Sequence, residues 1–131
     1  MKDIKHARHM LSMASKDLLA LEKMKDDPVY FYDEVYGFHA QQTVEKSMKA
    51  LLSYFGIKYR KIHDLGELLA LLKEKDNNSP QIFHGLLDLT DYAVMFRYDD
   101  YTDSPNTLNR EEIYNGVLNA YNYAKKLIEQ S

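Results

Sequence analysis

The sequence contains no cysteine, and only five glycines and three prolines among its 131 residues. Without cysteine, the chain can form no disulfide, thiolate zinc site or iron–sulfur cluster, and it offers no thiol nucleophile. So few turn-forming residues argue against an all-β fold. No apolar run approaches the roughly 20 residues needed to span a bilayer, and the first residues lack the apolar stretch of a signal peptide. We therefore expect a cytoplasmic protein without a membrane partner.

The length fits one domain, which we place over residues 1–131. A formal charge of -3 excludes a uniformly basic coat for nucleic acid. The charge is nevertheless uneven, because residues 36–63 carry five cations against one carboxylate, whereas residues 88–103 carry five aspartates against one arginine. The first segment could bind a phosphate and the second a basic partner. Solvated helix faces and a polar loop are the favoured explanation of both segments.

Apolar residues recur at steps of three and four along most of the chain, which predicts amphipathic helices. Proline, glycine and capping residues mark the boundaries of these helices, and a polar loop is expected over residues 98–108. Short connections between such stripes favour an all-α, antiparallel up-and-down bundle of four or five helices. The expected helices are residues 4–26, 33–55, 65–72, 80–96 and 110–127.

The second expected helix carries polar residues at helical spacing. His39, Gln42, Lys46 and Lys49 step by three, four and three, so they share one face beside the core face. The lysines could contact a phosphate, and the glutamine a base or ribose. Solvent-facing lysines and a glutamine bonded to backbone or water are the structural alternative. Glu45 precedes Lys49 by four residues, an i,i+4 pair worth about a few tenths of a kcal/mol on its own.

The segment that runs from Phe38 to Leu52, FHAQQTVEKSMKALL, resembles the FxAQQAVEKxxKALL signature of HEPN domains. Two shorter matches follow in order, IHDL at residues 62–65 and YAVMFRYD at residues 92–99. The resemblance covers nearly the whole chain. It implies a helical bundle, usually a homodimer, that is often encoded beside a minimal nucleotidyltransferase. The two proteins work as a toxin–antitoxin or nucleotide-handling pair, so that protein and a nucleotide or RNA are the expected partners.

Many HEPN domains are metal-independent ribonucleases, so the resemblance also suggests this activity. Their signature is an Arg followed, after four to six residues, by a His. Arg97 is present here, but the permitted histidine positions hold Thr102, Asp103 and Ser104. The sequence therefore favours a nucleotide-binding accessory subunit over a ribonuclease, and it predicts no confident catalytic residue. The ribonuclease alternative would use Arg97 with a non-standard partner such as Tyr101 or His63.

Arg97 can bind a phosphate through its planar fork or pair with a neighbouring aspartate at the helix end. Tyr98 and Tyr101 lie beside it, where a base could stack. Tyr30, Tyr32 and Tyr36, at the start of the second helix, suit either a subunit contact or the edge of the core. For His63, which precedes an expected helix cap, a structural role in that turn is favoured.

We predict no cofactor and no metal site, because the histidines have no metal-ligand spacing. Four aspartates could gather around magnesium, but loop solvation and capping explain them more simply. These are Asp91, Asp99, Asp100 and Asp103.

Overall fold

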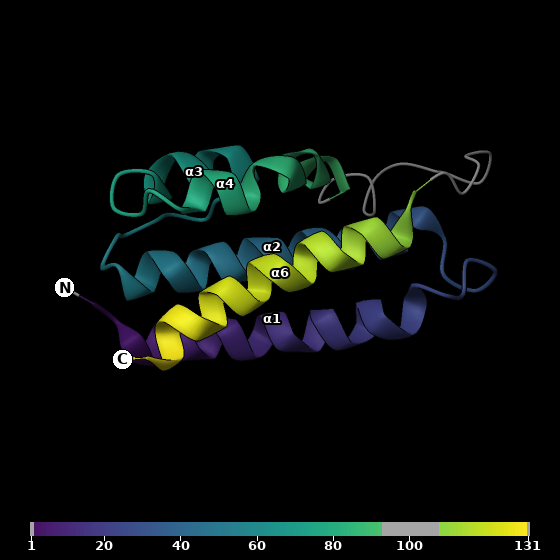
Figure 1. Ribbon diagram of the computed structural model, residues 1–131, viewed down its shortest axis with the longest axis horizontal. Coiled ribbons are helices and arrows are strands. Elements are labelled where there is room, and N and C mark those ends of the chain that lie inside the picture. Colours follow the sequence, from purple (N-terminus) through teal and green to yellow (C-terminus); the bar gives the residue numbers. More distant parts are fainter. Residues whose placement is uncertain (1, 93–107, 131) are drawn as a thin grey trace.

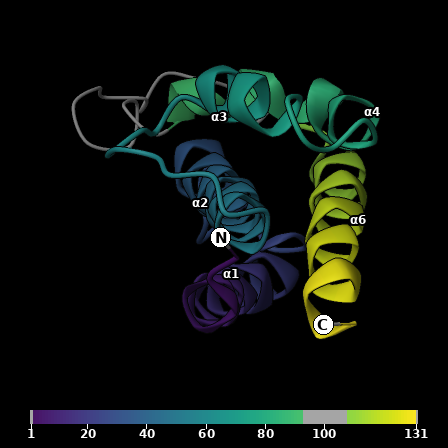
Figure 2. The ribbon, with the colours of Figure 1, turned by 90° about the vertical axis from the view of Figure 1, so that its left-hand side faces the viewer.

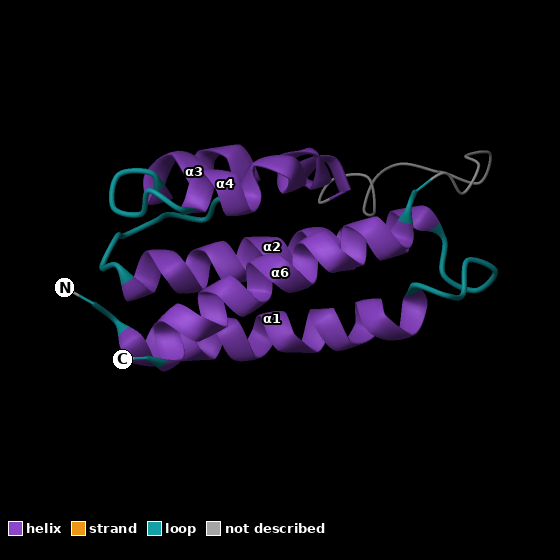
Figure 3. Ribbon diagram, viewed as in Figure 1, coloured by secondary structure: helices purple, strands orange, loops and turns teal. Residues whose placement is uncertain are grey.

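The computed structural model describes residues 2–92 and 108–130, and within these ranges the chain forms helices and no strand (Figures 1 and 3). The all-α fold is thereby confirmed. The elements are α1 (Ile4–Met24), α2 (Asp33–Tyr54), α3 (Leu65–Leu72), α4 (Ser79–Phe83), the 3₁₀ helix η1 (His84–Thr90) and α6 (Arg110–Glu129).

Helix α2 lies at the centre of the bundle, between α1 and α6 on one side and α3 with η1 on the other (Figure 2). Helix α1 runs antiparallel to α2 and α6, and the two chain termini lie at the same end of the bundle (Figure 1). Because α2 contacts neighbours around most of its circumference, 15 of its 22 residues are buried. Seven of the buried residues are polar, and several of them form the clusters described below. They are Asp33, Gln41, Thr43, Glu45, Ser47, Lys49 and Ser53.

Most helix boundaries agree with the sequence-based expectation. The side chains of Asp64 and Asn109 cap α3 and α6, each accepting a hydrogen bond of 3.1 Å from the backbone N–H three residues later. Gly56, just beyond α2, has a φ of 74°, a conformation that favours glycine. Pro80 occupies the first turn of α4, where its missing N–H costs nothing.

The fourth helix was expected to be one continuous α-helix through residue 96, and this prediction is wrong for the described residues. Helix α4 ends at Phe83, and the chain continues as the 3₁₀ helix η1. Phe83, Leu86 and Leu89 are buried and spaced three apart, a period that aligns side chains in a 3₁₀ helix. Gly85, with its poor α-helix propensity, lies at this transition. The expected stripe had included Ile82 instead, which is only half-buried.

The polar connection before α4 contains a buried carboxylate that the sequence did not suggest. Asp76 accepts hydrogen bonds from Asn78 N (3.0 Å), Ser79 Oγ (2.7 Å) and Tyr123 Oη (2.6 Å). Burial, together with the hydrogen bond to Asp76, raises the pKa of the Tyr123 phenol. The connection is thus bonded directly to α6.

Candidate functional site: polar clusters around helix α2

A partly buried ion cluster joins α1 to α2. Asp17 lies on α1, and its Oδ1 atom is 2.9 Å from His39 Nδ1. Its Oδ2 atom accepts a 2.6 Å hydrogen bond from Lys46 Nζ. The Asp17 and Lys46 side chains are only 13% and 19% exposed. Burial alone would raise the pKa of Asp17, but the hydrogen bonds and charges of His39 and Lys46 outweigh it and lower that pKa.

This lowered pKa predicts a specific dependence of stability on pH. A carboxylate with a lowered pKa stabilises the fold above its ordinary value, here 3.8, and loses that contribution as the pH falls through its folded-state pKa. Asp17→Asn should therefore cost about 1–2 kcal/mol in the free energy of unfolding at pH 7, since hydrogen bonds to charged groups contribute on that order. The cost should shrink below about pH 4. Urea denaturation at several pH values measures both quantities.

Glu22→Gln provides the matched control, because Glu22 is an exposed carboxylate on the same helix. Its effect should stay within about 0.5 kcal/mol at every pH. A cost of Asp17→Asn that is the same at pH 3 and pH 7 would contradict the assigned role of this cluster.

A second cluster surrounds Glu45 on the other side of α2. The Glu45 carboxylate accepts hydrogen bonds from Lys49 Nζ (3.1 Å) and from Gln41 Nε2 (2.8 Å). It also lies 3.1 and 3.2 Å from His63 Nδ1 in the connection to α3. Gln41 Nε2 donates further to the His63 carbonyl (3.2 Å), and Gln41 Oε1 accepts from Gln42 Nε2 (2.7 Å). The cluster therefore fixes the end of the α2–α3 connection, just before α3, on α2.

The structure divides the predicted polar stripe between the two carboxylates. His39 and Lys46 bind Asp17, whereas Lys49 binds Glu45 and Gln42 joins that network through Gln41. The alternative of solvent-facing lysines is wrong, because Lys49 is buried and Lys46 largely so. The expected Glu45–Lys49 pair is present, and both of its side chains are buried.

His63 has the most open position in the Glu45 cluster. Its side chain is 57% exposed, whereas that of Glu45 is 5% exposed. A carboxylate on Nδ1 orients an imidazole ring and leaves Nε2 for another partner. The structural role expected for His63 is thus present, through a contact with α2 that the local sequence did not indicate.

The predicted residues Arg97, Tyr98 and Tyr101 lie outside the described residues, as do three of the four aspartates considered for magnesium. The described residues contain no group of three or more side chains suited to hold a metal ion. None of the described helices is long and apolar enough to cross a membrane.

The ends of the segment that contains Arg97 are both placed against the start of α2. Tyr92 packs over Gly37, where a Cβ atom would come within 2.4 Å of the tyrosine ring. The backbone N–H of Leu108 donates a 3.1 Å hydrogen bond to Asp33 Oδ2. Thr90 Oγ1 also accepts a 3.0 Å bond from the N–H of Leu65, two residues beyond His63.

A buried arginine that the sequence analysis missed holds this end of the bundle together. Arg110 donates to the carbonyls of Met24 (2.9 Å) and Phe31, and to Asp33 Oδ1 (3.2 Å). An arginine in the first turn of a helix lies at the positive end of the helix dipole, which is unfavourable unless an acidic or carbonyl group pairs with it. The position of Arg110 in the sequence could therefore have indicated that it has such a partner.

Tyr36 belongs to the same buried cluster and is not a subunit contact. Its ring lies 4.9 Å from the Arg110 guanidinium, and its hydroxyl donates a 2.9 Å bond to the Arg110 carbonyl. Burial is the main reason that its pKa is raised to about 12. Tyr30 and Tyr32 are 81% and 55% exposed, so these two tyrosines remain the candidates for the predicted subunit contact.

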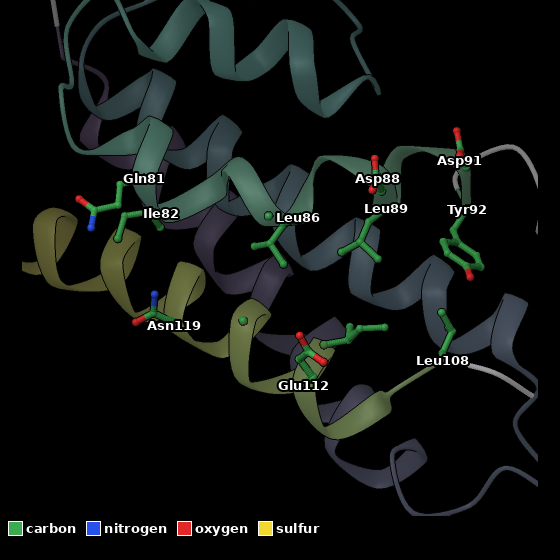
Figure 4. Close-up of a pocket in the computed structure, with 13 residues that line it drawn as sticks. Gln81, Ile82, Leu86, Asp88, Leu89, Asp91, Tyr92, Leu108, Glu112 and Asn119 are labelled. Carbon is green, nitrogen blue, oxygen red and sulfur yellow. The ribbon is translucent and has the colours of Figure 1, made fainter.

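A groove of about 680 Å³ runs between α4 with η1 and α6 (Figure 4). Leu86 and Leu89 point from η1 toward α6, whereas Asp88 and Asp91 point away on the outer side. The described residues that line the groove include Glu112 but no Lys, Arg or His. The charged side chains among these described lining residues would repel a nucleotide phosphate.

These features define an all-α bundle with a polar, largely buried central helix that bears the FHAQQTVEKSMKALL segment. The HEPN domain profile matches residues 7–130, almost the whole chain, and the protein therefore belongs to the HEPN domain family. Comparison with curated proteins and with solved structures gave no significant match.

Proposed function

We propose that this protein is a nucleotide-binding HEPN subunit that acts with a separately encoded minimal nucleotidyltransferase, in a toxin–antitoxin type pair. The HEPN match over residues 7–130 supports the class of protein. The observation that carries the nucleotide-binding part is the pair of fixed, carboxylate-held lysines on α2, Lys46 and Lys49.

Carboxylate pairing positions these lysines without using all of their donors. An ammonium group has three N–H donors, and the bond from Lys46 to Asp17 uses one of them. A phosphate oxygen that approaches the partly exposed side of Lys46 would add a second charged acceptor. His39 and Gln42 are half-buried beside it and offer ring nitrogen and amide groups to the same ligand.

Arg97, Tyr98 and Tyr101 remain part of this proposal as phosphate- and base-binding residues. The ribonuclease alternative is less well supported, because the sequence lacks the family histidine at residues 102–104. A homodimer is also proposed, with Tyr30 and Tyr32 in the contact because they are the exposed tyrosines between α1 and α2.

Calorimetric titration of ATP and other nucleotides into the purified protein, with and without the nucleotidyltransferase, tests this function. We expect saturable binding in at least one of the two settings. Absence of heat for every nucleotide in both settings would overturn the nucleotide-binding part.

A further inference from the structure

The N-terminal turns of α1 and the connection between α2 and α3 form one strongly basic surface, which we call the basic end. Two backbone and side-chain contacts join the segments: Asp3 N donates to Ser53 O (2.9 Å), and His6 Nε2 lies 3.0 Å from Tyr59 Oη. The cations of this surface are exposed. They are Lys2, Lys5, Arg8, Lys58, Arg60 and Lys61.

The carboxylates of the basic end do not cancel this charge. Asp3 and Asp64 each accept a backbone N–H at the start of a helix, from His6 and Glu67 respectively. Even without Arg8, Asp3, Asp64 and Glu67 oppose five exposed cations, so an excess of positive charge remains among the described residues. Such a surface attracts a polyanion and raises its association rate.

Tyr59 lies between two hollows of the basic end. One hollow, of about 470 Å³, is lined by His6, Gly56 and Lys58, and the other, of about 380 Å³, by Arg60 and Leu71. Tyr59 contributes to both. An aromatic ring flanked by cations and open spaces is the arrangement with which proteins bind single-stranded nucleic acid, because bases stack on the ring while phosphates meet the cations.

We propose that the basic end binds single-stranded nucleic acid, with phosphates on Lys58, Arg60 and Lys61 and a base beside Tyr59. A membrane is the less suitable polyanion, because the exposed large apolar residues of the described chain lie elsewhere: Leu19 on the C-terminal half of α1, and Val29, Tyr30 and Tyr32 between α1 and α2. The inference goes beyond the proposed function, which concerns a single nucleotide at Lys46.

Fluorescence anisotropy with labelled single-stranded RNA and DNA of mixed sequence, at several salt concentrations, tests the proposal. The variant K58Q/R60Q/K61Q should bind more weakly, and the slope of log affinity against log salt should fall by about 2, because each neutralised phosphate of a single strand contributes about 0.7. The control K16Q/K23Q/K25Q removes three lysines from the second half of α1 and its C-cap, away from the basic end and with the same change in net charge, and it should bind nearly as the parent does.

Two ring variants test the stacking step. Tyr59→Phe keeps the ring and should retain binding, whereas Tyr59→Leu should weaken it by about 5- to 150-fold, the range that corresponds to one stacked base. Unfolding curves of both variants show whether the fold is intact. If Tyr59→Leu is too unstable to compare, the lysine–arginine triple variant and its control decide the question.

The proposal is overturned if the two triple variants lose the same affinity, if duplexes or anionic vesicles bind better than single strands, or if no single strand binds. ATP titration of K58Q/R60Q/K61Q separates the two proposals. Unchanged ATP binding with lost single-strand binding supports a distinct surface, and joint loss of both would place nucleotide and nucleic acid at one site and contradict a separate basic end.

Discussion

Replacing Arg110 with alanine should lower the free energy of unfolding by about 3–5 kcal/mol, the usual cost of breaking a buried ion pair by removing one partner. The guanidinium reaches the end of α1 through the Met24 carbonyl, the following connection through Phe31, and the start of α2 through Asp33. Its loss leaves a buried carboxylate and two carbonyls without this donor. Urea denaturation of the purified variant measures the change.

Lys125→Ala is the matched control for this prediction, because Lys125 is an exposed cation on the same helix. Its effect should stay within about 0.5 kcal/mol. Arg110→Lys keeps the charge but not the planar fork that reaches several acceptors, so its loss should be intermediate. A loss below about 1 kcal/mol for Arg110→Ala would show that this cluster does not hold the three segments together.

Gly37→Ala should destabilise the protein by about 2–3 kcal/mol, although Gly→Ala inside a helix ordinarily stabilises by about 0.5–1 kcal/mol. The new Cβ would lie 2.4–2.6 Å from ring carbons of Tyr92, including Cγ. Because Cγ is bonded directly to Cβ of Tyr92, rotation of the ring about its own axis cannot relieve this clash. Tyr92 and the start of α2 would have to separate. Thermal and urea unfolding should both show the loss.

Gly116→Ala tests the same substitution where the neighbour can yield. Its Cβ would lie 3.2 Å from Leu86 Cδ2, the end of a rotatable side chain, so the expected change is a small gain or none. The double variant G37A/Y92A removes the clash and should recover part of the stability lost in Gly37→Ala. Equal effects of Gly37→Ala and Gly116→Ala would contradict close packing of Tyr92 on α2.

Local patterns in the sequence were sufficient for the helical class and for most boundaries. Asp64, Asn109 and Gly56 act within three or four residues of their own position, so composition and spacing identify them. The change from α4 to η1 was missed, because steps of three and four can be assigned either to a continuous α-helix or to a segment of period three.

The polar clusters could be predicted only in part. Spacing placed His39 and Lys46 on one face of α2, but their common partner Asp17 is 22 and 29 positions away on another helix. Arg110 and Asp33 are 77 positions apart. Periodicity shows which residues share a helix face, not which helix packs on that face, so pairs between distant helices require the three-dimensional structure.

The α2 lysines hold neighbouring elements in place, and we propose that they also offer a charge to a nucleotide phosphate. The two tasks can be separated, because the partner carboxylate can be neutralised together with the lysine. In D17N/K46Q, both charges of the α1–α2 pair are removed, and side chains of nearly unchanged size remain. A buried pair that is replaced as a pair costs much less stability than one that is broken on one side.

ATP titration of D17N/K46Q beside the parent protein shows whether Lys46 binds a nucleotide phosphate. We predict a folded variant whose ATP affinity is roughly 10- to 100-fold lower, because a charge-assisted hydrogen bond to phosphate contributes about 1.5–3 kcal/mol. A folded D17N/K46Q variant that binds ATP as tightly as the parent would show that Lys46 serves the fold alone, and it would contradict the assignment of nucleotide binding to this part of helix α2.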